Sequence, residues 1–185
     1  VRPRTNVATL RRLQAELAEQ DKHHAIEELT ALGVTFPVEM DYYIAAANPV
    51  SLDSANVLAQ SISNSLGDDF MKLNIKTYVS SSTQEVLNPH LQSITMNGWG
   101  ADYGDPQNYL GNEVSGNDSA YYSRTQNNIN DVEATEATQD LLDTYAEFTA
   151  MVAEADAITD DLDARYAAYA KAEAYMIDHV LTLPT

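Results

Sequence analysis

The stretch VEMDYYIAAANPVSLDSANVLAQSISNSLGDDFMKLNIKTYV, residues 38–79, determines the fold class that the sequence predicts. At its start, apolar and polar residues alternate from Val38 to Ile44, which is the pattern of a half-buried strand. Apolar residues then recur every four positions between Leu58 and Leu66, which indicates a helix. Alternation returns from Leu73 to Val79. A strand, a helix and a second strand predict a βαβ unit, and therefore an α/β sheet with parallel pairing.

Working outward from this stretch, the same patterns predict the rest of a single domain over residues 1–185. The sheet is expected to be mixed and flanked by helices. The other predicted elements are a helical segment over 5–32, in one piece or broken near 20–23, a third strand over 94–98, a long irregular segment over 100–131, and two helices around 141–152 and 162–180.

Helix ends have their own signals in this sequence. Ser51 and Thr159 are expected to cap the helices that follow them, because short hydroxyl side chains accept hydrogen bonds from free helix N–H groups. Gly33 and Gly67 follow periodic segments and are expected to end them, since glycine adopts the left-handed conformation that closes a helix.

The charge distribution excludes several partners. The net charge is -18, and eleven acids with no base lie between Asp131 and Asp163. Such a field repels phosphate backbones, so we expect no nucleic-acid binding and interpret most acids as a solvated surface. No cysteine is present, which excludes thiolate chemistry. No apolar run is long enough to span a bilayer and no signal peptide begins at Val1; if the protein is secreted, its targeting segment is expected outside this chain.

The densest chemical signal is the segment NGWGADYGDP, residues 97–106. It carries the only tryptophan, Trp99, and an acid, Asp102, that could pair with a cationic group of a ligand. Its glycines allow close backbone approach and unusual dihedral angles. The alternative interpretation is a glycine-rich turn whose tryptophan fills a core. Other aromatic side chains that a ligand could meet are Tyr42, Tyr43, Tyr103, Tyr109, Tyr121 and Tyr122, whereas Tyr145, Tyr166, Tyr169 and Tyr175 are expected to pack on helices.

Known catalytic and cofactor motifs do not match. The glycine spacing from Gly98 to Gly104 is one residue too long for a dinucleotide fingerprint, and neither a phosphate-binding loop nor a serine nucleophile elbow occurs. His23 and His24 lie four residues before Glu27 and Glu28, but without the metalloprotease order, so we interpret them as an exposed helix face. We therefore expect no enzyme, no catalytic residue, no metal site and no cofactor.

At this point the motif resembles a known family. Gly98 to Pro106, followed by Tyr109 and Leu110, is similar to the GWGxDYxDPxxYL segment of family 5 extracellular solute-binding proteins, the oligopeptide receptors of Opp-type ABC importers; the streptococcal Ami/Ali-like lipoproteins look closest. Gly33 to Val38 resembles their GVTFPI segment, and Ala164 to Ala170 with Leu183-Pro184-Thr185 resembles their closing helix and its exit. Residues 1–24 match the family poorly.

The resemblance implies a fold, a site and partners. It implies one lobe of a bilobal class II periplasmic-binding-protein fold, which closes by a hinge on an extended oligopeptide. By position, Asp102 would receive the peptide's α-amino group and Trp99 would pack beside the ligand. Backbone groups of Gly100 and Ala101 would add strand-like hydrogen bonds, and Tyr103 would shape a pocket. The implied partners are ABC permease subunits, on the extracellular face or in the periplasm, with a lipid anchor outside this chain.

Two rival functions stay open at this stage. The same fold could hold another cargo, such as a dipeptide, a nickel chelate, a sugar or a peptide pheromone, because fold does not fix function. A hydrolase acting through acids of the 100–110 loop is the more distant alternative, since no nucleophile with a base and an orienting group is visible.

Overall fold

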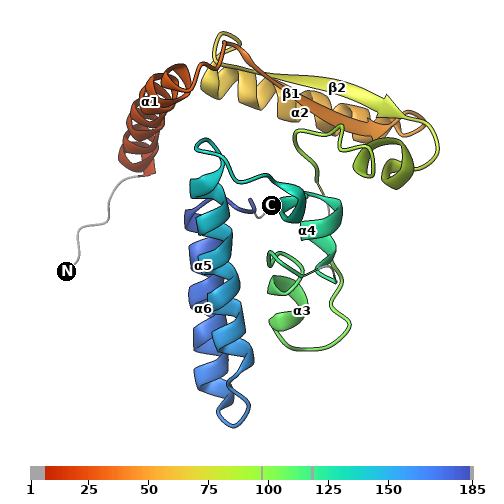
Figure 1. The fold of residues 1–185 in the computed structure, drawn as a ribbon. Coiled ribbons are helices and arrows are strands. Elements are labelled where there is room, and N and C mark those ends of the chain that lie inside the picture. Colours follow the sequence, from red (N-terminus) through yellow and green to blue (C-terminus); the bar gives the residue numbers. More distant parts are fainter. Residues whose placement is uncertain (1–6, 97, 118, 184–185) are drawn as a thin grey trace. The chain divides into compact units, whose positions relative to one another are not determined.

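The computed structural model describes residues 7–96, 98–117 and 119–183, with side chains from residue 16 onward except Arg124. The predicted helix start at residue 5 therefore lies outside the described residues, as do Asn97 and Pro184-Thr185 of the quoted motifs. Two compact units make up the chain (Figure 1). The first runs to Ser82 and includes Gln92–Ile94, and the second comprises Thr83–Leu91 and continues from Thr95. The single domain expected over residues 1–185 stays a prediction.

The first unit contains the predicted βαβ arrangement. Its elements are α1 (Val7–Ala31), β1 (Val38–Ala45), α2 (Pro49–Leu66) and β2 (Met71–Tyr78). The two strands pair in parallel over their whole length, from Val38 opposite Met71 to Ala45 opposite Tyr78. The expected parallel pairing is confirmed, and α1 is a single helix without a break near residues 20–23.

The core of this unit follows from the strand pattern. The apolar face buries Ile44 and Leu73, and α2 packs beside the strands with Ala55 buried. Phe70 stacks on Phe36 at 5.6 Å between ring centroids. The Lys22 ammonium group of α1 lies 5.7 Å from the centroid of the Phe70 ring, which ties α1 to this unit.

The third strand was a wrong prediction. Among the described residues of this segment, 94–96 and 98, only Ile94 pairs with β1, through a single parallel bridge to Tyr42. The backbone N–H groups of Ser93 and Ile94 both donate to the carbonyl oxygen of Asp41, at 2.9 and 3.4 Å. Beyond Ile94 the chain passes into the second unit. Glycines, which weaken strands, follow within a few residues, so alternation alone overestimated this element.

Two predicted helix caps were also wrong. Asn48, not Ser51, is the N-cap of α2: its side-chain oxygen accepts from the backbone N–H of Ser51 at 3.2 Å. Asp161, not Thr159, caps α6 by accepting from the N–H of Ala164 at 2.9 Å. Ser51 lies inside α2, so the amide of Asn48, three residues earlier, is at the capping position. Asp161 lies two residues nearer to α6 than Thr159, and its carboxylate takes the capping position there. Gly67 does end α2, with φ of 82°.

The second unit is helical. Its elements are η1 (Thr83–Leu87), α3 (Gln107–Leu110), α4 (Tyr121–Thr125), η2 (Ile129–Asp131), α5 (Gln139–Asp156) and α6 (Leu162–Asp178). The helices α5 and α6 form a hairpin, and the segment 100–131, expected to be irregular throughout, carries the short helices α3, α4 and η2 (Figure 1). The predicted closing helices are confirmed.

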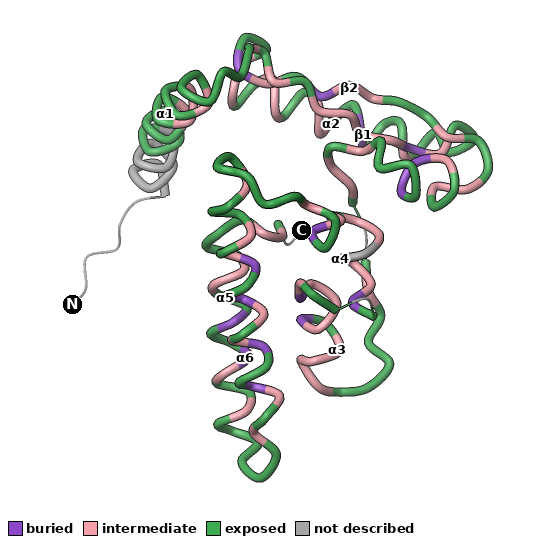
Figure 2. Tube along the Cα trace, viewed as in Figure 1, coloured by how far each residue is buried: buried purple, intermediate pink, exposed green. Residues whose placement is uncertain are grey.

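The core of the second unit lies between this hairpin and the short helices. Buried positions on α5 and α6 recur along the faces that meet (Figure 2). The cluster comprises Leu110, Val114, Ala120, Phe148, Val152, Ala155, Tyr169 and Ala172. The short helix α3 contacts both α5 and α6, so the core holds the segment that carries the predicted site. None of the described helices is both long and apolar enough to cross a bilayer.

Candidate functional site

All five predicted site residues lie in the second unit, in the irregular segment just before α3. The Trp99 side chain is half-buried, whereas Gly100, Ala101, Asp102 and Tyr103 are exposed. The site was expected at the end of a third strand. Because that strand is reduced to a bridge at Ile94, the irregular segment is positioned by α3 and by its own hydrogen bonds instead.

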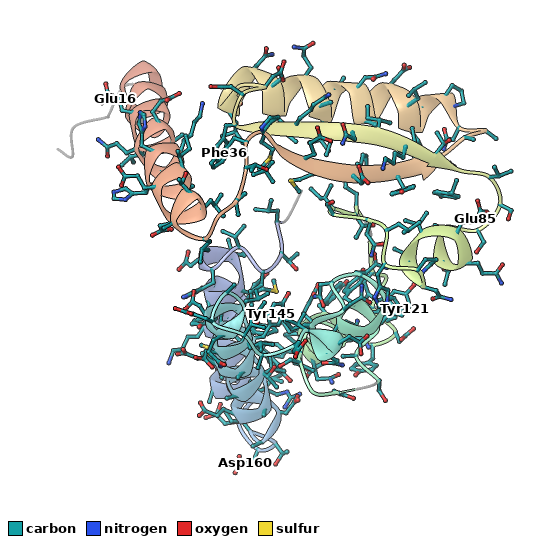
Figure 3. The ribbon with its side chains drawn as sticks, turned by 45° about the horizontal axis from the view of Figure 1, so that its top comes forward. Glu16, Phe36, Glu85, Tyr121, Tyr145 and Asp160 are labelled. Carbon is teal, nitrogen blue, oxygen red and sulfur yellow. The ribbon has the colours of Figure 1, made fainter. Side chains whose placement is uncertain are left out.

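Trp99 is held by an aromatic cluster and one hydrogen bond. Its ring centroid lies 5.4 Å from that of Tyr121 and 6.2 Å from that of Tyr122, both on α4 (Tyr121 is labelled in Figure 3). The indole Nε1 donates to the side-chain oxygen of Asn108 at 3.1 Å. The indole is thus held by packing and a hydrogen bond, and the part of its surface that stays exposed is accessible to a ligand.

Asn108 connects the two residues of greatest interest. Its side-chain oxygen also accepts from the backbone N–H of Asp102, at 2.7 Å. The neighbouring Asn112 extends the connection: its amide donates to the Asn108 carbonyl at 2.9 Å, and its own carbonyl accepts from the N–H groups of Tyr122 and Ser123. The helix α3 therefore orders both the Trp99 loop and the start of α4.

The Asp102 carboxylate is exposed and has no hydrogen-bond or ion-pair partner among the described backbone and side-chain groups, which exclude the side chains before residue 16 and that of Arg124. A carboxylate with this freedom accepts hydrogen bonds only, so it suits a cationic donor from outside. The Tyr103 hydroxyl donates to the side-chain oxygen of Gln107, and the residue as a whole is 53% exposed. Together Trp99 and Asp102 present an apolar surface beside a negative charge.

The motif glycines do not have the unusual dihedral angles expected. Among the described glycines only Gly33, Gly67 and Gly116 have positive φ. A Cβ added at Gly98 or Gly100 would meet no heavy atom within 4 Å. The local fold therefore does not require glycine there, and the open space beside the backbone is what a closely approaching ligand would need.

Asp105, which sits in the same motif, has a structural role. Its two carboxylate oxygens accept from Nε and Nη2 of Arg165 at 3.0 Å each. This paired, charge-assisted contact lowers the pKa of Asp105 and raises that of Arg165. Asp105 also accepts from the N–H of Gln107 at 2.9 Å, so the acid joins α3 to α6.

Arg165 has further partners at the turn between α5 and α6. Its Nη1 donates to the carbonyl oxygens of Ala155, Asp156 and Ile158 at 3.0, 3.0 and 3.2 Å. Its Nη2 also reaches the Tyr169 hydroxyl at 2.9 Å. The guanidinium thus satisfies the C-terminal carbonyls of α5 and anchors the Trp99 loop to the hairpin.

A half-buried carboxyl group, that of Glu113, lies close to the aromatic cluster. Burial raises the pKa of Glu113 to about 7, although a hydrogen bond with Thr182 opposes the shift. The pKa of Tyr122 is raised mainly by burial and to a smaller extent by the negative charge of Glu113. The same two causes raise the pKa of Tyr145 to about 12. Glu113 is therefore a group that titrates near neutral pH and acts electrostatically on Tyr122 and Tyr145.

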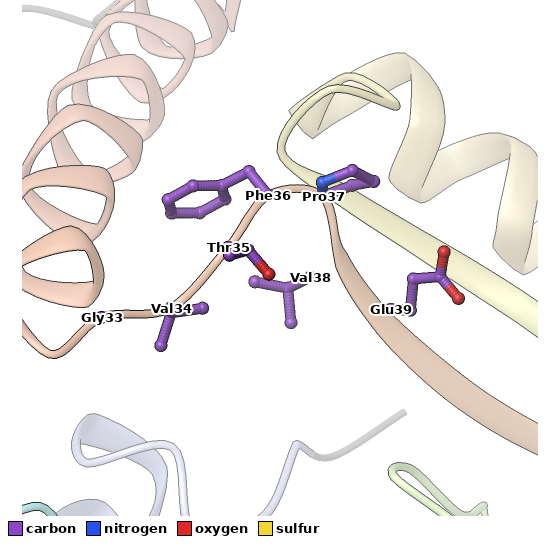
Figure 4. A pocket seen from close by; sticks show the side chains of 7 residues that line it. All are labelled: Gly33, Val34, Thr35, Phe36, Pro37, Val38 and Glu39. Carbon is purple, nitrogen blue, oxygen red and sulfur yellow. The ribbon is translucent and has the colours of Figure 1, made fainter.

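An open hollow in the first unit is a separate feature. It is lined by one continuous segment, Gly33 to Glu39, which follows α1 and begins β1 (Figure 4). The only ionisable side chain in its lining is Glu39. It contains none of the five predicted residues. No group of three or more His, Cys, Asp or Glu residues that could hold a metal ion occurs in the described part of the chain.

Sequence reasoning missed Asn108 and Arg165. Asn108 lies inside the family motif, at a position the motif leaves unspecified, so only its contacts reveal it. Arg165 could have been found from composition, because it is one of only three bases among the residues of the second unit. An isolated base in so acidic a segment is expected to be paired.

Comparisons with known proteins give relatives for nearly the whole chain. No protein-family model matches it. The chain is 32% identical over 182 residues to the oligopeptide-binding protein SarA of Streptococcus gordonii. The aligned region covers 92% of this chain and 26% of SarA. It is 30% identical over 177 residues to the oligopeptide-binding protein AliB of Streptococcus pneumoniae, with the same two coverages. The chain therefore spans about a quarter of the length of these relatives.

A solved structure shares the fold. The unliganded open form of MppA, a periplasmic murein tripeptide binding protein, is 20% identical with a TM-score of 0.59, over 89% of this chain and 27% of MppA. This likeness confirms the predicted α/β class and its periplasmic-binding-protein type. The relatives confirm the family resemblance drawn from the motif, and all carry the names of binding proteins.

Proposed function

Because this chain is homologous to streptococcal oligopeptide-binding proteins over 92% of its length, we propose that it is the ligand-contacting lobe of a solute-binding protein that captures oligopeptides for an ABC importer. The proposal rests on two features of one ordered loop: a half-buried Trp99 side chain and an Asp102 carboxylate without a partner among the described side chains. The protein acts by binding and release rather than by catalysis.

The site binds the amino-terminal end of the peptide. Asp102 accepts from the α-ammonium group, and the exposed part of Trp99 covers the first side chain. The open backbone at Gly100 and Ala101 adds main-chain hydrogen bonds that any peptide sequence can satisfy. The second lobe of the intact protein supplies the opposite wall, and hinge closure creates the form that the permease recognises. The protein works outside the cell or in the periplasm, with its lipid anchor outside this chain.

Replacing Asp102 by asparagine is expected to lower the affinity for a free-amino pentapeptide by about 10-fold to 100-fold, the range for one charge-assisted hydrogen bond. Titration followed by Trp99 fluorescence measures this, because Trp99 is the only tryptophan of the chain. The same peptide with an acetylated amino group should bind the wild type and Asp102→Asn equally weakly. Asp178→Asn, which removes one exposed charge from the end of α6, is the matched control. Equal loss in both variants, or unchanged affinity in Asp102→Asn, would count against the proposed site.

The charge of the second unit predicts a preference among peptides. Its residues include eighteen acids and three bases, and one of those bases, Arg165, is already paired. Acids also lie at the turn between α5 and α6, where Asp160 is labelled in Figure 3. Such a field accelerates association with cations and is screened by salt. We expect a lysine-containing peptide to bind at least about 3-fold more weakly when ionic strength rises tenfold. A neutral peptide of equal length should change little, and equal salt effects on both would contradict this preference.

A further inference from the structure

The orientation of the Asn108 side-chain amide is fixed by its neighbours. Its oxygen accepts from the indole N–H of Trp99 at 3.1 Å and from the backbone N–H of Asp102 at 2.7 Å. Both of these groups can only donate a hydrogen bond, so the amide cannot be flipped without losing both contacts. The amide nitrogen of Asn108 must therefore point away from the two groups that hold its oxygen.

This nitrogen carries two donors that the protein does not use. Among the described residues, the Asn108 Nδ2 has no hydrogen-bond partner, and it is also absent from the buried polar atoms that lack one. It therefore reaches solvent, although the residue as a whole is only half-buried. The next asparagine of the segment differs, because the Asn112 amide nitrogen is engaged by the Asn108 carbonyl at 2.9 Å.

We propose that Asn108 is a further ligand-binding residue, whose side-chain amide donates to the first carbonyl oxygen of a peptide held at Asp102. This inference rests on the proposed function and adds a second contact to it. The backbone of Asp102 and the side chain of Asn108 touch, so an acceptor, the Asp102 carboxylate, and a donor, the Asn108 amide, extend from neighbouring points. The first residue of a peptide offers the complementary pair, an ammonium donor and a carbonyl acceptor joined through one Cα.

The complementarity gives Asn108 a part in specificity. A simple amine satisfies Asp102 but leaves the Asn108 donors to water, whereas an α-aminoacyl end satisfies both. An α-aminoacyl end therefore gains a hydrogen bond that a simple amine lacks, which favours the α-aminoacyl end. The pair thus distinguishes peptide amino termini from other cations.

The test combines Asn108→Asp with a change in the ligand. A carboxylate at this position still accepts from Trp99 and Asp102, but it has no donor. Thermal melting and the Trp99 emission spectrum should therefore stay close to those of the wild type, while Asn108→Ala changes both. The probes are a free-amino pentapeptide and the same peptide with a thioamide at its first peptide bond, because sulfur is a weaker acceptor than oxygen. We expect the wild type to prefer the oxygen peptide by about 3-fold to 10-fold, and Asn108→Asp to show no preference.

The outcomes separate this inference from the function on which it rests. Loss of the preference in Asn108→Asp, with unchanged Trp99 emission, supports the direct contact. A preference of the same size in both proteins overturns the contact while peptide binding stands. No binding of either peptide to the wild type overturns both proposals.

Discussion

Replacing Arg165 by alanine is expected to lower the melting temperature of the second unit by on the order of 10 °C. The guanidinium makes a two-point contact with Asp105 and donates to three carbonyl oxygens, two in the last turn of α5 and one just beyond it. Its side chain is 16% exposed, so water replaces these partners poorly once it is removed. The Asp105 carboxylate would be left without its counter-charge beside the loop that carries Trp99.

Two further variants identify the cause of this loss. Arg165→Lys should recover only a small part of it, because an ammonium group cannot bridge both Asp105 oxygens and the carbonyls at once. Lys171→Ala removes an exposed base from the same helix and should shift the melting temperature by about 2 °C or less. We also expect Arg165→Ala to shift Trp99 emission to longer wavelength, since the loop loses its anchor. If Arg165→Ala lowered the melting temperature no more than Lys171→Ala does, the anchoring role would be contradicted.

Glu113 is expected to make the second unit less stable at alkaline than at acidic pH. Burial raises its pKa from 4.5 to about 7 in the folded chain. Between these two values the folded state holds a proton that the unfolded state has released, so the stability of the folded state falls as pH rises through this window. The shift corresponds to a loss of up to about 3 kcal/mol in the free energy of unfolding, complete above about pH 7.

Denaturant unfolding at about pH 5 and about pH 8 measures this difference. Glu113→Gln keeps the shape of the side chain without its charge, so it should remove most of the fall and exceed the wild type in stability at the higher pH. Glu173→Gln, at an exposed position of α6, should leave the fall unchanged. Hydrogen exchange of α5 and α6 amides assigns the effect to this unit. If the stability of Glu113→Gln fell with pH by as much as that of the wild type, another group would be responsible.

These expectations also bear on ligand binding. Glu113 influences Tyr122, which packs against Trp99. Arg165 holds Asp105, three residues beyond Asp102. Both groups act through the support of the loop and touch no part of the candidate ligand surface. Their variants should therefore change stability first and peptide affinity only as the Trp99 loop loosens.

Some features of the candidate site follow from the sequence, and others do not. The motif between Gly98 and Pro106 was sufficient to propose five site residues and to predict the resemblance to oligopeptide-binding proteins, which the relatives confirm. The roles of those residues stay predictions. Asn108 and the Arg165–Asp105 pair could not be derived, because the first contact spans six to nine residues of irregular chain and the second spans sixty. No sequence period relates such positions.

For the fold, the sequence by itself determined the elements whose pattern repeats locally. Apolar alternation from Val38 to Ile44 and periodicity in α2, α5 and α6 predicted these elements, because one face of each must be buried whatever its neighbours. Only the tertiary structure decided whether a segment with strand-like alternation finds a neighbouring strand to pair with. Ile94 pairs with β1, but the chain then leaves the sheet, so an alternating segment forms no strand. It also decided which acid is paired: Asp102 and Asp105 are three residues apart, yet among the described side chains only Asp105 meets a guanidinium, because α6 brings Arg165 to that side of the loop.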